Sequence, residues 1–153
     1  MHDPTLWTVE QQLWTAGADL FEERLDAGAV LVCSTHGALD RRTFIDLVRQ
    51  QPYAQSARLA NRHSYSPSND VAVLAYDVHA LKNDGDYYGR CRSTYVRING
   101  IWLLAMHNQL QLTAVDAEAD GLIGSPDRSI TARLLGPLVH RLTHAFEPGP
   151  GPI

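Results

Sequence analysis

The junction of two β-rich runs at Asn99-Gly100 constrains the fold of this chain more than any other sequence feature. Asn-Gly between such runs is typical of a two-residue hairpin loop in a type I′ turn. That turn pairs Ile98 with Ile101. Strict alternation of side chains then predicts that Arg92 lies opposite His107. The face that carries both residues also carries Thr94, Ala105 and Gln109, a mixture that suits either a ligand pocket or a solvent-exposed outer face.

Clusters of turn-forming residues divide the middle of the chain into expected strands. These strands cover residues 57–64, 70–81, 87–99 and 101–112. The breaks between them are the segments 66–69 and 83–86 and the Asn-Gly pair. Consecutive strands joined by short turns predict an antiparallel meander.

Amphipathic helices are expected before these strands. A first helix begins at Asp3 and Pro4, is interrupted near Gly17, and continues as a shorter helix over residues 19–26. A strand over residues 29–34 follows, and Asp40 caps a helix over residues 41–50. Helices and strands segregated along the chain predict an α+β fold, with the N-terminal helices packed in the concavity of a strongly curved antiparallel sheet.

The C-terminal part is expected to lie outside this α+β roll, which spans residues 1–113. Residues 114–147 are interpreted as a polar linker followed by an amphipathic helix over residues 130–146. The leucine stripe of that helix should pack on the roll or on a partner subunit, because exposing it would form a large apolar patch. The Pro- and Gly-rich residues 148–153 are expected to be disordered.

Composition and charge exclude several classes of function. The chain has 153 residues, 13 of them Lys or Arg, and a net charge of −4, which suits one globular domain and argues against nucleic-acid binding. No apolar run approaches the roughly 20 residues that span a bilayer, so we expect a cytoplasmic protein without membrane contact. Cys33 and Cys91 stand apart and are expected to be buried thiols. The pair His140 and His144 lacks a third ligand, so no metal and no cofactor are expected.

Several residues between positions 6 and 112 match the pattern of one superfamily. They are Leu6, Glu10, Trp14, Ala16 and Asp19 of the opening helix, the strand at Val30–Val32, the Gly37–Asp40 turn, and the hairpin residues Tyr95-Val96-Arg97, Asn99-Gly100, Trp102 and His107. On these residues the chain resembles the nuclear transport factor 2-like superfamily, and within it the SnoaL-like and ketosteroid-isomerase-like domains. The resemblance implies a cone-shaped α+β roll with a pocket between helix and sheet, usually dimeric through the sheet.

The catalytic groups of the steroid isomerases in that superfamily are not matched. The resemblance would place a carboxylate base on the first strand, an acid at the position of Thr94 and a tyrosine on the first helix. The chain has no carboxylate between Asp26 and Asp40 and no tyrosine in its first helix. We therefore expect no steroid isomerase activity, because proton transfer by that mechanism lacks its base.

Candidate site residues follow from the predicted hairpin face, which the resemblance turns toward the pocket. There His107 would act as a general base or hydrogen-bond donor, and Arg92 would hold it neutral. Gln109 would orient a substrate oxygen. The remaining expected lining residues are Trp14, Phe21, Asp77, His79, Thr94 and Ala105. Several also have a structural interpretation: His107 as a structural histidine, Asp77 and His79 as a solvated patch, and Trp14 and Phe21 as core.

Two classes of function remain. The first is a small-molecule-binding domain for an apolar or mixed-polarity ligand, with lyase-, isomerase- or hydrolase-like activity if His107 moves a proton. The second is a non-catalytic dimerisation or accessory module with a filled cavity. In either class we expect a homodimer, because few helices are available to cover the outer side of the sheet.

Overall fold

The structure is a computed structural model and describes residues 4–123 of the chain. Its helices are α1 (Pro4–Leu13), α2 (Ala18–Arg24), α3 (Arg41–Gln50) and α4 (Ala114–Ala119). Its strands are β1 (Leu25–Cys33), β2 (Gly37–Asp40), β3 (Ser56–Ser68), β4 (Val71–Lys82), β5 (Gly85–Ile98) and β6 (Ile101–Gln111). The expected helix over 130–146, the tail 148–153 and the predicted cap Asp3 lie outside the described residues.

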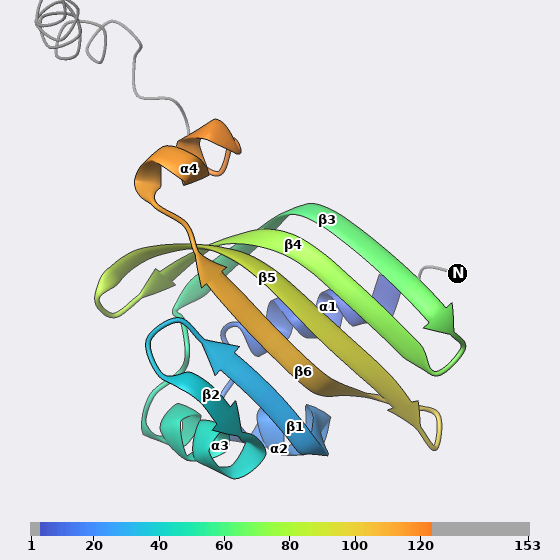
Figure 1. The fold of residues 1–153 in the computed structure, drawn as a ribbon. Helices are drawn as coiled ribbons and strands as arrows, with labels where there is room; N and C mark the ends of the chain where they lie inside the picture. Colours follow the sequence, from blue (N-terminus) through green and yellow to red (C-terminus); the bar gives the residue numbers. More distant parts are fainter. Residues whose placement is uncertain (1–3, 124–153) are drawn as a thin grey trace, which may run out of the picture. The chain divides into compact units, whose positions relative to one another are not determined.

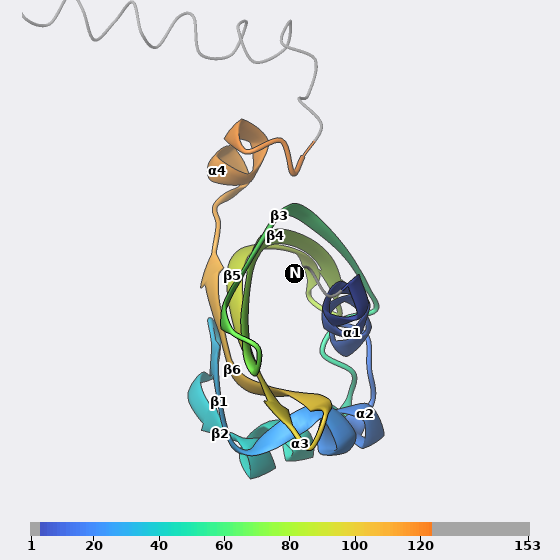
Figure 2. The same cartoon turned by 90° about the vertical axis from the view of Figure 1, so that its right-hand side faces the viewer.

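The six strands form one curved sheet that is not closed, in the order β2-β1-β6-β5-β4-β3. Helix α1 lies on its concave side, and α2 and α3 lie at the end near β1 and β2 (Figures 1 and 2). The predicted α+β class with N-terminal helices in the concavity is confirmed. The sheet is mixed rather than antiparallel, however, because β1 runs parallel to β6. The segment 37–40, expected as a turn, is the edge strand β2.

Helix α3 has the predicted bounds because its sequence carries both a start signal and an apolar face. The Asp40 side chain accepts a hydrogen bond from the backbone N–H of Thr43 at 2.8 Å. This bond lowers the pKa of the Asp40 carboxyl. Phe44, Ile45 and Val48 recur at helical spacing and are buried. Together these features attach α3 to the end of the sheet, where it forms one wall of a pocket.

The β5–β6 hairpin contains the predicted type I′ turn. The backbone angle φ is positive at both Asn99 (51°) and Gly100 (80°), as that turn requires. The pairing also follows the prediction from Ile98 and Ile101 at the turn as far as Tyr95.

Beyond Tyr95 the predicted register is wrong, because a β-bulge interrupts β6. The extra residue is Ala105. Ser93, rather than Arg92, therefore pairs with His107. The bulge turns His107 to the buried, concave face and leaves Arg92 exposed on the convex face.

The segment after β6, expected as a polar linker, begins with the short helix α4. The Thr113 side chain caps this helix. Arg90 of β5 binds Asp120, and Arg58 of β3 donates a hydrogen bond to the backbone oxygen of Leu122 at 3.0 Å. These contacts attach the end of the described chain to the sheet. None of the helices in residues 4–123 is long and apolar enough to cross a membrane.

Candidate functional site

The concave side of the sheet buries a carboxylate. Glu10 of α1 is only 2% exposed. Its side chain accepts hydrogen bonds from Ser93 Oγ at 2.6 Å and from the hydroxyls of Tyr76 and Tyr95. Glu10 points inward because it lies four residues after the buried Leu6 and three before the buried Leu13, on the same face of α1. The hydroxyl donors satisfy a charge that would otherwise be costly to bury.

A chain of hydrogen bonds leads from Glu10 toward the end of the sheet near α3. Ser93 Oγ lies 2.7 Å from His107 Nδ1, and His107 Nε2 lies 3.1 Å from Gln109 Nε2. The Tyr53 hydroxyl donates to Gln109 Oε1 at 2.7 Å. Since Ser93 gives its hydrogen to Glu10, a neutral His107 donates from Nδ1 to Ser93 and accepts at Nε2 from the Gln109 amide. The chain therefore has one consistent direction and holds the Tyr53 hydroxyl in place.

His107 is neutral in this setting. Burial lowers its pKa, and the Glu10 carboxylate, 3.7 Å from Nδ1, acts in the opposite direction. A lowered pKa agrees with the neutral His107 that the sequence suggested, but its cause is burial and not Arg92. Burial, together with the Glu10 charge, raises the pKa of Tyr76 and Tyr95, so both hydroxyls remain donors.

The space beside this hydrogen-bond chain is too small for an organic ligand. The inner cavity, lined by Glu10, Trp14, Phe21, His107 and Gln109 among others, has a volume of about 30 Å³. That volume is about the share of one water molecule in the liquid. The Trp14 ring fills the adjoining space, where it donates to the Tyr76 hydroxyl at 2.9 Å and packs 5.4 Å from the Tyr53 ring. A larger ligand requires another site.

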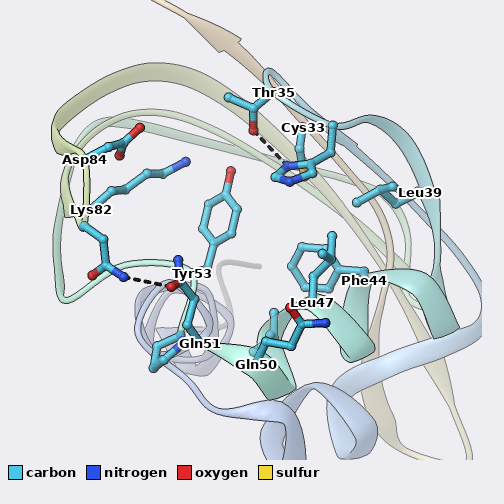
Figure 3. Close-up of a pocket in the computed structure, with 14 residues that line it drawn as sticks. Cys33, Thr35, Leu39, Phe44, Leu47, Gln50, Gln51, Tyr53, Lys82 and Asp84 are labelled. Carbon is cyan, nitrogen blue, oxygen red and sulfur yellow. Dashed lines mark hydrogen bonds between the residues drawn. The ribbon is translucent and has the colours of Figure 1, made fainter.

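A larger pocket opens between α3 and the adjoining ends of β1, β2 and β4, with a volume of about 490 Å³ (Figure 3). Its apolar wall consists of Leu39, Phe44, Leu47 and Val48. Polar side chains, among them His36, Tyr53, Lys82 and Asp84, line the remainder. The volume lies in the range of about 300–1,000 Å³ that is typical of small-molecule sites. Tyr53 joins this pocket to the buried chain, because the same residue lines the pocket and binds Gln109.

Lys82 reaches the pocket from the last position of β4. Alternation along that strand places it on the same face as the buried Tyr76, Val78 and Ala80. The ammonium lies 4.0 Å from the centroid of the Tyr53 ring, and burial lowers its pKa. Figure 3 shows its side chain directed toward Tyr53, opposite the apolar wall.

The structure brings some of the expected site residues together and separates others. His107, Gln109, Trp14 and Phe21 all line the small inner cavity. Arg92 and Thr94 lie on the convex face instead, and Ala105 is the bulged residue, so the expected pairing of Arg92 with His107 is wrong.

Asp77 and His79 do not form a pair with each other. Asp77 is buried beneath Arg90, which donates to it at 3.2 Å, and it also accepts from Asn61 at 2.7 Å. His79 lies 2.8 Å from Asp86 and belongs to the convex side of the sheet. Over residues 4–123, no group of three His, Cys, Asp or Glu side chains could hold a metal ion.

Sequence reasoning did not single out Glu10, Tyr53 and Lys82 as site residues. A signal existed for two of them. Glu10 interrupts an apolar helical face, and Lys82 continues the inward phase of β4. Tyr53 follows Pro52 in a connection without periodicity, so no local pattern predicts its position.

Comparison with known proteins places the fold. No family model and no curated protein sequence matches the chain. Solved structures do match, and they show that the chain has the nuclear transport factor 2-like, or cystatin-like, fold. An NTF2-like protein of unknown function in nutrient uptake from Rhodospirillum rubrum superposes with a TM-score of 0.63 at 15% identity, covering 73% of this chain and 100% of that one.

Two further structures show how widely this fold is used. A candidate ketosteroid isomerase from Parabacteroides distasonis has a TM-score of 0.61 at 14% identity and covers 72% of this chain and 88% of its own. The association domain of C. elegans CaMKII has a TM-score of 0.54 at 12% identity and covers 69% and 88%. At these identities the similarity defines the fold alone, and the function has to be argued from the residues of the site.

Proposed function

We propose that this protein is a small-molecule-binding domain whose ligand occupies the pocket between α3 and the end of the sheet. The observation that carries the proposal is a pocket of about 490 Å³ with an apolar wall and a few convergent polar groups. The fixed Tyr53 hydroxyl provides a pre-oriented oxygen at its floor. Fold neighbours that include an isomerase candidate and a protein connected with nutrient uptake are compatible with this function.

In this proposal His107 acts on the ligand only through other residues. Its ring nitrogens contact Ser93 and Gln109. The inner cavity beside it has a free volume of only about 30 Å³. We therefore assign His107 a positioning role, in which it fixes Gln109 and through it Tyr53. A general-base role remains a prediction from the sequence, and it would require the ligand to displace Trp14.

A variant that fills the pocket tests the proposal. Leu47→Trp places a large ring in the space between α3 and Tyr53, whereas Arg42→Trp adds the same ring at an exposed position of the same helix outside the pocket. A library of organic fragments is screened by NMR for compounds that shift the amide signals of Phe44 and Tyr53. These fragments should bind Leu47→Trp at least ~10-fold more weakly and Arg42→Trp unchanged. If Leu47→Trp binds them as tightly as the wild type, the proposal is wrong.

A second candidate function, an oligomerisation module, is favoured by the convex face of the sheet. The pairing register aligns Tyr65, Val73, Thr94, Met106 and Val30 in one row across β3, β4, β5, β6 and β1. In this row Met106 is 45% exposed and Tyr65 is 68% exposed. Exposed apolar side chains on a contiguous face are typical of interaction sites. The name of the CaMKII association domain is compatible with assembly through this fold.

A further inference from the structure

Among the residues that the structure describes, Lys82 is a cation without an ionic partner. It is the only lysine in the sequence, in which Lys and Arg together number 13. Its Nζ lies 4.0 Å and 4.2 Å from the ring centroids of Tyr53 and Tyr87. Within residues 4–123, no carboxylate lies close enough to form an ion pair with it. Aromatic faces attract the ammonium but do not neutralise it.

The Lys82 ammonium is also partly desolvated in the pocket. Lys82 is half-buried, and burial is the main cause of its lowered pKa, while the Asp84 carboxylate among other groups acts in the opposite direction. A cation that has lost part of its hydration binds an anion more strongly than a fully solvated one does. The charge of Lys82 is therefore available to a ligand.

The remaining lining limits the kind of anion. Among the described residues that line the pocket, Lys82 is the one lysine or arginine. Asp84 adds a negative charge to the lining. A polyphosphate carries several negative charges, which one cation with Asp84 nearby cannot balance, whereas a single carboxylate can form an ion pair with the Lys82 ammonium. Leu39, Phe44 and Leu47 offer an apolar surface to the body of the ligand.

We propose that the ligand of this pocket is an amphipathic organic carboxylate, with its carboxylate on Lys82 and its apolar part against α3. The inference rests on the small-molecule function proposed above and adds the chemical class of the ligand. The Tyr53 hydroxyl, whose hydrogen is donated to Gln109, offers the ligand an oxygen lone pair and not a second anion-binding donor. The charge of the ligand thus depends on Lys82.

Selective labelling of Lys82 provides the test. Reductive methylation with isotope-labelled formaldehyde marks amines and keeps their positive charge. No other lysine is present, and the Lys82 signal is distinguished from that of an α-amine by its loss in Lys82→Met. The probes are octanoate and phenylacetate, each compared with its neutral amide. Both acids should bind at least ~10-fold more tightly than their amides, and both should raise the pKa of the labelled Lys82 amine because an anion stabilises its charged form.

Variants at position 82 separate charge from shape. Lys82→Met keeps the apolar stem and should remove the preference for acid over amide. Lys82→Arg keeps a positive charge and should retain that preference. Arg97→Met is the matched control, because it removes a cation stacked 5.3 Å from the Trp102 ring outside the pocket. The preference should be unchanged in that control.

The two proposals fail in different ways. Equal affinity for acid and amide, or an acid that binds without changing the pKa of Lys82, would overturn the anion assignment and leave small-molecule binding in place. Failure of both acids to bind while library fragments do bind would overturn it equally. Binding of acids and fragments that Leu47→Trp does not weaken would instead overturn the proposed function itself.

Discussion

At the scale of single residues, Glu10 determines the polarity of the interior. Its carboxylate accepts from Tyr76, Ser93 and Tyr95, and Ser93 is thereby made an acceptor for His107. The sequence predicts His107 as a noteworthy polar residue, but not its partners. Hydroxyl residues on strands are common, and only the bulge and the packing of α1 bring these particular ones together.

The burial of neutral His107 predicts a specific pH dependence of stability. Its folded-state pKa lies below the ordinary value of 6.5. The unfolded chain therefore binds a proton that the folded protein does not bind, and the free energy of unfolding falls as the pH drops below about 6.5, by at most about 1.4 kcal/mol per pH unit. Urea titrations between pH 7 and pH 5 measure this slope. The lowered carboxyl pKa of Asp40 acts below its ordinary value of 3.8, outside that window.

The assignment of that slope to His107 is checked with two variants. His107→Gln should lose the slope, and should be less stable at pH 7 by about 1–3 kcal/mol because buried partners lose hydrogen bonds. His36→Gln, at an exposed position, should keep the slope. A slope that persists in His107→Gln would mean that another group titrates.

At the scale of secondary-structure elements, the sequence best predicts those whose ends carry a local capping or turn signal. Asp40 marks the start of α3, and Asn99-Gly100 marks the hairpin turn. The bulge at Ala105 has no such mark, because Leu103, Leu104, Ala105 and Met106 are all apolar and show no alternation that an extra residue could interrupt. The parallel pairing of β1 with β6 joins segments far apart in the chain, and no local pattern encodes it.

The hairpin turn predicts a cost for a side chain at Gly100. Its φ of 80° is the left-handed region that favours glycine. Gly100→Ala should lower the free energy of unfolding by about 1–2 kcal/mol, measured by urea denaturation, because a Cβ disfavours that conformation. Asn99→Gly is the control, since glycine suits the first turn position, and it should change stability by less than about 0.5 kcal/mol. Equal stability of Gly100→Ala and the wild type would contradict this account of the turn.

At the scale of the whole molecule, the two proposed functions use opposite sides of the same sheet. The pocket with Tyr53 and Lys82 belongs to the concave side and α3, whereas the apolar row with Met106 and Tyr65 lies on the convex face. No residue of the row lines the pocket. Ligand binding and self-association are therefore compatible, and a variant that disrupts one should leave the other intact.

The convex face predicts a homodimer whose interface is centred on Met106. When a second copy packs on this face, the carboxylate introduced by Met106→Asp becomes buried without a partner. The substitution should therefore weaken association by about 2 kcal/mol or more, roughly 30-fold in Kd. Analytical ultracentrifugation at micromolar concentrations measures the change. Val115→Asp adds the same charge on α4, where Val115 is 76% exposed, and should leave the dimer intact. If the wild-type protein sediments as a monomer, the proposed oligomerisation function is wrong. The proposal of small-molecule binding would then still be tested by fragment binding to the pocket.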